Sequence, residues 1–302
     1  MGLKILTEND PITVSQLVVC IQALPGIGKT SIGFTGRDAL LIDFDKGVHR
    51  SKNRRKTAVV ETWDDVLQID DSVLSNYKTV VLDTAGRALE MLTTSIIDED
   101  PKMGKKGGGL QIQGWGALGV KFAAWVSYIK SRKKDLVFLC HVDEKQNGDK
   151  IKENLDVKGG SKNEIHKSCD IMGRLYLQEG NRFLDFNPCE SSFGKNPVGL
   201  APIKVPDFAE EPEFLGNLIE SIKGKLSEMS EVQRKTAEIQ DFWRNRVVQA
   251  TEAEEYTTIR NEIISSEESD ATKGLVRSLL ASTMVAKKLD FDPKSKCFVK
   301  VA

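Results

Sequence analysis

The stretch ALPGIGKT at residues 23–30, directly after the apolar run 17–21, indicates the fold more clearly than any other part of the sequence. A glycine-rich turn of this kind points backbone N–H groups at phosphate oxygens, and the N-terminus of the following helix adds its positive dipole end. The pattern is typical of a P-loop, in which Lys29 neutralises the β- and γ-phosphates and Thr30 gives its hydroxyl to Mg²⁺. Ala23 replaces the first glycine of the pattern. The residues expected to hold a nucleoside triphosphate are Pro25, Gly26, Ile27, Gly28, Lys29, Thr30 and Ser31.

The composition is that of an ordinary globular protein. The chain has 302 residues, 40% of them hydrophobic, which is enough for one large or two modest domains. Its formal net charge is -1, so any binding to nucleic acid has to come from local patches. The five cysteines show no paired spacing, which predicts reduced thiols in a cytoplasmic protein. The sequence shows no secretion signal or apolar run of membrane-helix length, so we expect no membrane partner.

Short apolar runs alternate with helical or polar stretches in residues 1–200, which predicts an α/β core with a mostly parallel sheet flanked by helices. Thr62, followed by an acidic first turn, predicts a helix start. Prolines at 197, 202, 206 and 212 punctuate the end of the core and the segment after it, so we expect a linker over 201–213 and a helical C-terminal region over 214–302. The runs that predict strands are 17–21, 39–42, 79–82, 136–140 and 171–177.

A P-loop enzyme also needs an acid that holds Mg²⁺, at the end of a buried strand. Asp83 ends the strand-forming run 79–82 and fits this role. Because Thr84 rather than a glutamate follows it, the base that orients the attacking water has to come from elsewhere. Asp45, just after the run 39–42, is our choice, because the carboxyl ends of parallel strands share one edge of a sheet. Asp43 is the nearest alternative for the base, and capping of a helix is the structural alternative for these acids.

These motifs together resemble the phage-encoded RecA-like P-loop ATPases, also labelled AAA-family ATPases, some of which act in single-strand DNA annealing and recombination. The resemblance implies ATP and Mg²⁺ as cofactors and a place in the bacterial host cytoplasm. It also implies that His141, after the run 136–140, senses the γ-phosphate; a structural histidine is the alternative. A glutamate usually stands in place of Asp45 in this family. The likeness covers roughly the first 200 residues and rests on 25–30, 41–47, 62–65, 80–84 and 138–141.

The resemblance implies two DNA-contacting loops, one after the Asp83 strand and one after the His141 strand. Residues 101–109 are basic and glycine-rich, and Trp115 lies just beyond them as a platform for stacking bases. Residues 144–162 form a long polar segment in which acids nearly balance the lysines. Solvated surface charge is the alternative for both. The lysines expected to contact single-stranded DNA are Lys102, Lys105, Lys106, Lys158 and Lys162.

RecA-like ATPases work as rings or filaments, so the resemblance also implies self-association. Lys195 is then the candidate for a basic residue that reaches the nucleotide of a neighbouring subunit; an exposed turn lysine is the alternative. The leading hypothesis is an ATP-dependent single-stranded-DNA-binding protein of phage recombination or annealing. Two others stay open: an ATPase that loads or remodels a single-strand-binding or replication protein, and a nucleotide-dependent assembly module with little hydrolysis.

Overall fold

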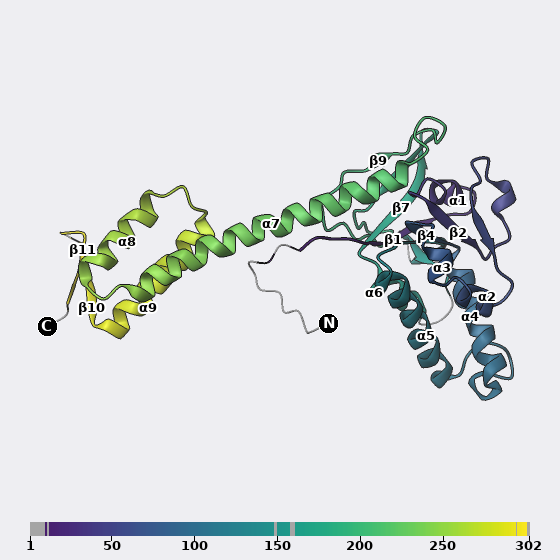
Figure 1. Ribbon diagram of the computed structural model, residues 1–302, viewed down its shortest axis with the longest axis horizontal. Helices are drawn as coiled ribbons and strands as arrows, with labels where there is room; N and C mark the ends of the chain where they lie inside the picture. Colours follow the sequence, from purple (N-terminus) through teal and green to yellow (C-terminus); the bar gives the residue numbers. More distant parts are fainter. Residues whose placement is uncertain (1–9, 11, 148–149, 158–160, 294, 301–302) are drawn as a thin grey trace. The chain divides into compact units, whose positions relative to one another are not determined.

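The computed structural model describes residues 10, 12–147, 150–157, 161–293 and 295–300 (Figure 1). The chain divides into two compact units, a larger one of Val14–Leu226 and a smaller one that contains Ser227–Ala302. This division differs from the expected one, in which the core ends at residue 200 and a linker covers 201–213. The segment after residue 200 belongs to the larger unit.

A mixed, mostly parallel sheet forms the centre of the larger unit, as the sequence predicts. Six strands run parallel in the order β3-β2-β4-β5-β1-β7. Strands β8 and β9 extend the β7 edge in antiparallel fashion, and β6 pairs with the far part of β5. The strands are β1 (Val18–Ala23), β2 (Ala39–Asp43), β3 (Thr57–Val59), β4 (Thr79–Asp83), β5 (Asp135–Asn147), β6 (Lys150–Leu155), β7 (Ile171–Gln178), β8 (Asn181–Asp185) and β9 (Ile203–Lys204).

Helices cover both faces of this sheet, and further helices form most of the smaller unit. Within the described residues, no helix is long and apolar enough to cross a membrane. The helices are α1 (Lys29–Gly33), α2 (Trp63–Leu67), α3 (Asp71–Leu74), α4 (Ala85–Glu99), α5 (Ile112–Ser131), α6 (Ser161–Ser168), α7 (Phe214–Gln249), α8 (Ala253–Ser265) and α9 (Asp270–Lys287), with short 3₁₀ turns η1 (Val48–Arg50) and η2 (Pro101–Met103).

Side chains alternate between the two faces of each strand, and this alternation divides the core into two clusters. In β1, Val18 and Cys20 lie in the cluster that packs against α4 and α5, whereas Val19 and Ile21 lie in the other cluster with residues of α1. Leu215 and Ile219, in the first turns of α7, are buried in this second cluster. The start of α7 is therefore part of the core that holds the sheet.

The helix start at Thr62 is confirmed. The Thr62 hydroxyl accepts a hydrogen bond from the Asp65 N–H, and the Asp65 carboxylate accepts one from the Thr62 N–H. This reciprocal capping satisfies two backbone donors at the first turn of α2. The helix then buries Trp63 and Val66 against the sheet.

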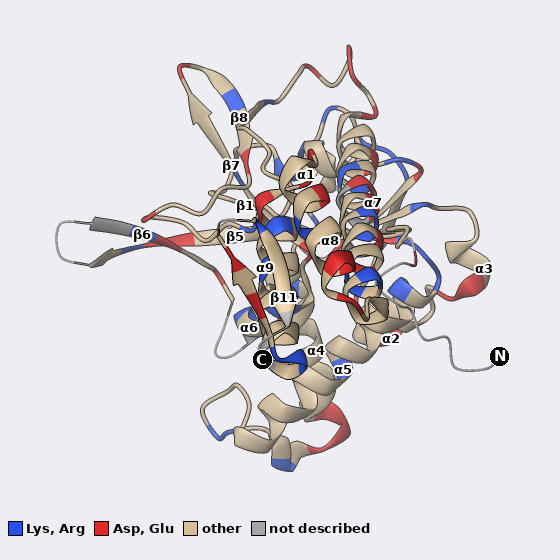
Figure 2. Ribbon diagram, turned by 90° about the vertical axis from the view of Figure 1, so that its left-hand side faces the viewer, with Lys and Arg blue, Asp and Glu red and all other residues tan. Residues whose placement is uncertain are grey.

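Residues 144–162 differ from the expected long loop. They contain the end of β5, all of β6 and the start of α6, and the two strands pair in the register Glu144↔Glu153 and Lys145↔Lys152. Figure 2 shows both signs of charge along this hairpin. Because most of its side chains are charged, the segment lacks the apolar alternation that marks a half-buried strand.

The smaller unit has its own core. The last part of α7 supplies Trp243 and Val247, which are buried with Tyr256 and Ile259 of α8 and Val276 of α9. A hairpin of β10 (Leu289–Asp292) and β11 (Cys297–Lys300), which the sequence analysis did not foresee, completes the unit.

Candidate nucleotide site

The acidic and imidazole side chains expected at the site come together at the carboxyl edge of the sheet. Asp43 pairs in register with Asp83, and Ala23 pairs with His141. Strand alternation gives these positions the same face of the sheet as Val19, Leu41 and Val81, which is the face that α1 covers. The P-loop and the chemistry-bearing residues thus share one edge and one face.

The P-loop turn connects β1 with α1 through two glycines in the left-handed region, Gly26 at φ 80° and Gly28 at φ 108°. Residues with a Cβ rarely adopt these angles, which explains why glycines stand here. Lys29 is buried, and its Nζ donates hydrogen bonds of 2.9 Å each to the carbonyls of Ala23 and Leu24. Burial lowers the pKa of Lys29 to about 8. The Lys29 ammonium is therefore held beside the start of the P-loop turn by two backbone carbonyls.

Thr30 and Asp83 meet directly. The Thr30 hydroxyl donates a 2.7 Å hydrogen bond to Asp83 Oδ2. Burial, with a smaller contribution from the nearby carboxylates of Asp45 and Asp43, raises the pKa of Asp83 to about 6 against the opposing effects of Thr30 and Lys29. A buried carboxylate with acidic neighbours gains from a cation at this position.

Asp45 belongs to a second polar cluster beside the first. Its backbone N–H and that of Phe44 both point to the Asp83 carbonyl, at 3.3 and 2.8 Å. Its carboxylate lies 3.4 Å from His141 Nε2 and 3.2 Å from Arg87 Nε. The hydrogen bond to His141 and the charges of His141 and Arg87 lower the pKa of Asp45. Asp45 is therefore an ionised carboxylate at neutral pH.

Asp43 has a different role from Asp45. It is buried, and its two carboxylate oxygens accept hydrogen bonds from the backbone N–H groups of Gly47 and Val48, at 3.2 and 3.1 Å. Both oxygens are thus used to hold the turn that follows β2. Asp43 is 1% exposed, whereas the Asp45 side chain is 21% exposed and is held by the side chains of His141 and Arg87, so a water molecule can reach Asp45 more readily than Asp43.

Two arginines at the site were not foreseen. Arg182 of β8 donates a 2.8 Å hydrogen bond to the Ile27 carbonyl, and a Cβ at Gly28 would lie 3.1 Å from Arg182 Nε. Arg87 of α4 joins Asp45 to Glu90. Neither arginine belongs to a recognisable motif, so only the pairing of β7 with β8 and the start of α4 after Asp83 could have placed them. Ser31, in α1, lies 2.9 Å from Ser51 through their hydroxyl oxygens.

A cavity of about 560 Å³ lies beside the first turns of α4. Residues Gly107–Gly109 and Trp115 line one part of it, and Gly86, Leu89 and Val157 line another. Lys102, Lys105 and Lys106 are exposed on the same loop as the three glycines. The Lys105 N–H donates to the Gly109 carbonyl at 3.0 Å, so the loop closes into a tight turn.

The remaining predicted residues lie outside this cluster. Lys158 is outside the described residues. Lys162 is exposed on α6 and lines a second cavity, together with His166. Lys195 is hydrogen-bonded through its Nζ to the Cys169 carbonyl at 2.6 Å. A single chain does not test a role of Lys195 in a neighbouring subunit, so that role stays a prediction.

The chain matches the model of a known protein family over the region that forms this edge of the sheet. The pattern of the AAA domain matches residues 15–198, which is more than half of the chain and includes the P-loop, Asp45, Asp83 and His141. The chain therefore belongs to the AAA-domain family and carries a P-loop ATPase core. No curated protein matches it significantly.

Among solved structures, 73 chains match significantly. One is a KaiC-like protein from the hyperthermophilic archaeon Pyrococcus horikoshii, with a TM-score of 0.35 and 10% identity. The match covers 65% of this chain and 99% of that protein. A likeness of this degree supports no conclusion about function.

Proposed function

We propose that this chain is an ATP-dependent single-stranded-DNA-binding protein of phage recombination or annealing, and that it hydrolyses MgATP at the P-loop. The observation that carries the ATPase part of the proposal is the 2.7 Å contact between Thr30 and Asp83, which share the carboxyl edge of the sheet with the buried Lys29 and the Asp45–His141 pair. This arrangement unites, at one edge of the sheet, groups for a phosphate, a divalent cation and a water molecule.

The donor groups present fit Mg²⁺. This ion prefers oxygen ligands and is commonly held by one or two protein oxygens together with substrate phosphates. The Thr30 hydroxyl and the Asp83 carboxylate are such a pair, and the pKa of about 6 leaves Asp83 ionised at neutral pH. Bound there, Mg²⁺ would neutralise charge on the β- and γ-phosphates. Lys29 would exchange its two carbonyl partners for phosphate oxygens.

Asp45 and His141 supply the remaining chemistry. An ionised carboxylate orients a water molecule for in-line attack by accepting a hydrogen bond from it. His141 holds one oxygen of Asp45, and its other ring nitrogen, Nδ1, is buried without a hydrogen-bond partner among the described residues. A histidine in this position can change its contact with Asp45 when the γ-phosphate leaves. We assign Asp45 the base role and His141 the sensor role.

The DNA part of the proposal rests on the cavity beside α4. Trp115 offers an aromatic surface in it, and base–aromatic stacking is the usual sequence-tolerant way to hold a single strand. The exposed Lys102, Lys105 and Lys106 lie on the loop that lines the cavity and would contact the phosphate backbone. Because α4 begins directly after Asp83, a change at the Mg²⁺ site would reach the cavity through its first turns.

The proposal is tested first by the turnover of two site variants. Lys29→Ala and Asp83→Ala should each abolish steady-state ATP hydrolysis, because each removes a group that only the nucleotide site needs. Arg55→Ala is the matched control, since Arg55 is exposed and its guanidinium donates a hydrogen bond to the Pro212 carbonyl rather than to a P-loop residue. Unchanged turnover in both site variants would refute the assignment of the site.

A further inference from the structure

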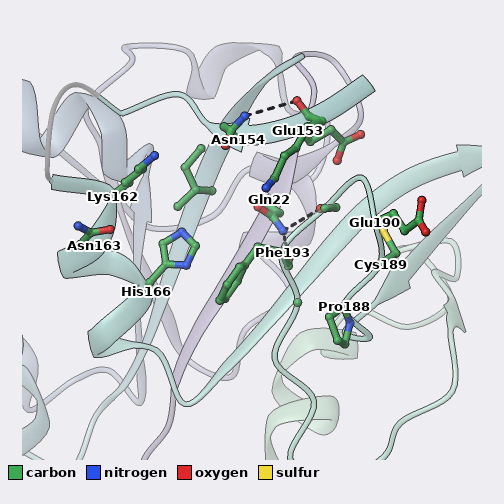
Figure 3. Close-up of a pocket in the computed structure, with 14 residues that line it drawn as sticks. Gln22, Glu153, Asn154, Lys162, Asn163, His166, Pro188, Cys189, Glu190 and Phe193 are labelled. Atoms are coloured by element: carbon green, nitrogen blue, oxygen red, sulfur yellow. Dashed lines mark hydrogen bonds between the residues drawn. The ribbon is translucent and has the colours of Figure 1, made fainter. Parts of the chain in front are cut away.

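A second cavity, of about 490 Å³, lies within the larger unit between β6, α6 and the segment 188–194 (Figure 3). Its floor includes Gln22, the residue of β1 directly before Ala23. Gln22 lies on the same face of β1 as Val18 and Cys20, because side chains two residues apart in a strand share a face. It therefore points to the sheet face opposite α1. The cavity is therefore separate from the P-loop site, although both use the carboxyl end of β1.

Phe193 gives this cavity an aromatic surface. Phe193 is 53% exposed and lines the cavity, so part of its ring is open to a ligand there. The ring packs against the His166 ring, with centroids 4.3 Å apart and planes at 74°. The buried Gln22 amide holds the segment in place through hydrogen bonds to the Ser192 hydroxyl and the Phe193 carbonyl. An exposed ring on an anchored segment suits a flat ligand.

The charges around the cavity favour an anion near α6. Lys162 and Lys152 are exposed lining residues, and the charge of Glu153 is balanced by its ion pair with Arg174. In Figure 3, Lys162 and His166 lie on one side and Glu190 lies on the opposite side, with Phe193 between them. Burial and the charge of Lys162 lower the pKa of His166, so this ring is neutral at pH 7.

We propose that this cavity binds one nucleotide of the single-stranded DNA, with the base stacked on Phe193 and the phosphate held by Lys152 and Lys162. The inference rests on the proposed function, because it assigns a second contact to the same strand. The amides of Asn154 and Asn163, which also line the cavity, can hydrogen-bond to the edge of any base, so the site would be tolerant of sequence.

The test is the affinity of a fluorescein-labelled thymidine oligonucleotide, measured by anisotropy with MgATP present. Phe193→Ala should weaken binding roughly five- to 160-fold, the range of one lost base–aromatic stack. Lys162→Ala should make the negative slope of log affinity against log salt shallower by about 0.7. Leu177→Ala is the matched control, because Leu177 is 52% exposed in the same unit but does not line the cavity.

A second readout uses the unchanged chain. Photocrosslinking to an oligonucleotide that carries 5-iododeoxyuridine should attach a base to Phe193, identified by mass spectrometry of the peptides. Crosslinks only at Trp115, or equal affinities for Phe193→Ala and Leu177→Ala, would overturn this inference and leave the proposed function standing. No binding of the oligonucleotide by the wild-type chain would overturn both.

Discussion

At the scale of a single residue, Asp83 is subject to two opposing effects on its ionisation. Cation binding requires an ionised carboxylate, whereas burial favours the protonated form and raises the pKa to about 6. At neutral pH the folded chain therefore holds a charge that destabilises it. Asp45 is the opposite case, because His141 and Arg87 lower its pKa and its ionised form stabilises the fold.

These shifts predict opposite effects of two similar substitutions. Asp83→Asn should raise the free energy of unfolding at pH 8 by about 1–3 kcal/mol, because the cost of ionising Asp83 is fully present above pH 6. Towards pH 4 the gain should fade, since Asp83 is then protonated in the folded chain. Asp45→Asn should lower the stability at pH 8 and lose this effect as the pH falls. Urea unfolding at both pH values measures the differences. A gain for Asp83→Asn that is the same at pH 4 and pH 8 would contradict the account.

The motif residues of the site could be predicted from the sequence. Lys29, Thr30 and Asp83 lie in motifs whose spacing follows from phosphate and cation chemistry, so their meeting could be predicted. Arg182 and Arg87 could not, because their roles depend on which strand lies beside the P-loop and on where α4 points. Asp43 could be separated from Asp45 only by its hydrogen bonds to the turn after β2.

At the scale of elements, the strands with apolar runs were predicted to within a few residues, except that β5 continues to Asn147, because a strand buried on both faces consists almost wholly of apolar residues. The β5–β6 hairpin was missed for the opposite reason, although Asn147-Gly148 in the sequence is a strong turn signal. Helix α7 was expected only as part of a helical region over 214–302. It is one helix of 36 residues whose middle carries few apolar residues to reveal its periodicity.

Gly86 marks a close contact between two elements at the site. A Cβ there would lie 2.8 Å from the Asp156 carbonyl oxygen, which is backbone and cannot easily move. Gly86→Ala should therefore destabilise the chain by about 1–3 kcal/mol. Gly116→Ala is the matched control, since Gly116 is helical and has open space around its Cβ position. Thermal unfolding compares the two. A Gly86→Ala variant as stable as Gly116→Ala would show that this contact does not constrain the site.

The basic loop after α4 is expected to contact the backbone of single-stranded DNA. Neutralising Lys102, Lys105 and Lys106 together should weaken binding of single-stranded DNA and lower its salt slope by about 2, because each lost phosphate contact contributes about 0.7. ATP binding should stay nearly unchanged. The matched control neutralises Lys52, Arg54 and Lys56, which are equally basic and exposed but lie between β2 and β3 rather than on this loop. Equal salt titrations for the two triple variants would remove this loop from the DNA site.

At the scale of the whole molecule, the resemblance to RecA-like ATPases leads us to expect self-association into a ring or filament. Sedimentation velocity should show larger species with a non-hydrolysable ATP analogue and Mg²⁺ than without nucleotide. Lys29→Ala should stay at the size of the nucleotide-free chain, because it cannot hold the phosphates. A monomer in all conditions would contradict the expected assembly and would leave Lys195 without a neighbouring subunit to contact.

The central claim is that ATP hydrolysis at the P-loop and single-stranded DNA act on one another. The most direct measurement is steady-state ATP hydrolysis with and without single-stranded DNA, with Lys29→Ala as the control for contaminating activity. We expect hydrolysis that DNA stimulates and that Lys29→Ala abolishes. Hydrolysis that DNA leaves unchanged would contradict the claim and favour an ATPase that remodels another protein, whereas no hydrolysis at all would favour a nucleotide-dependent assembly module.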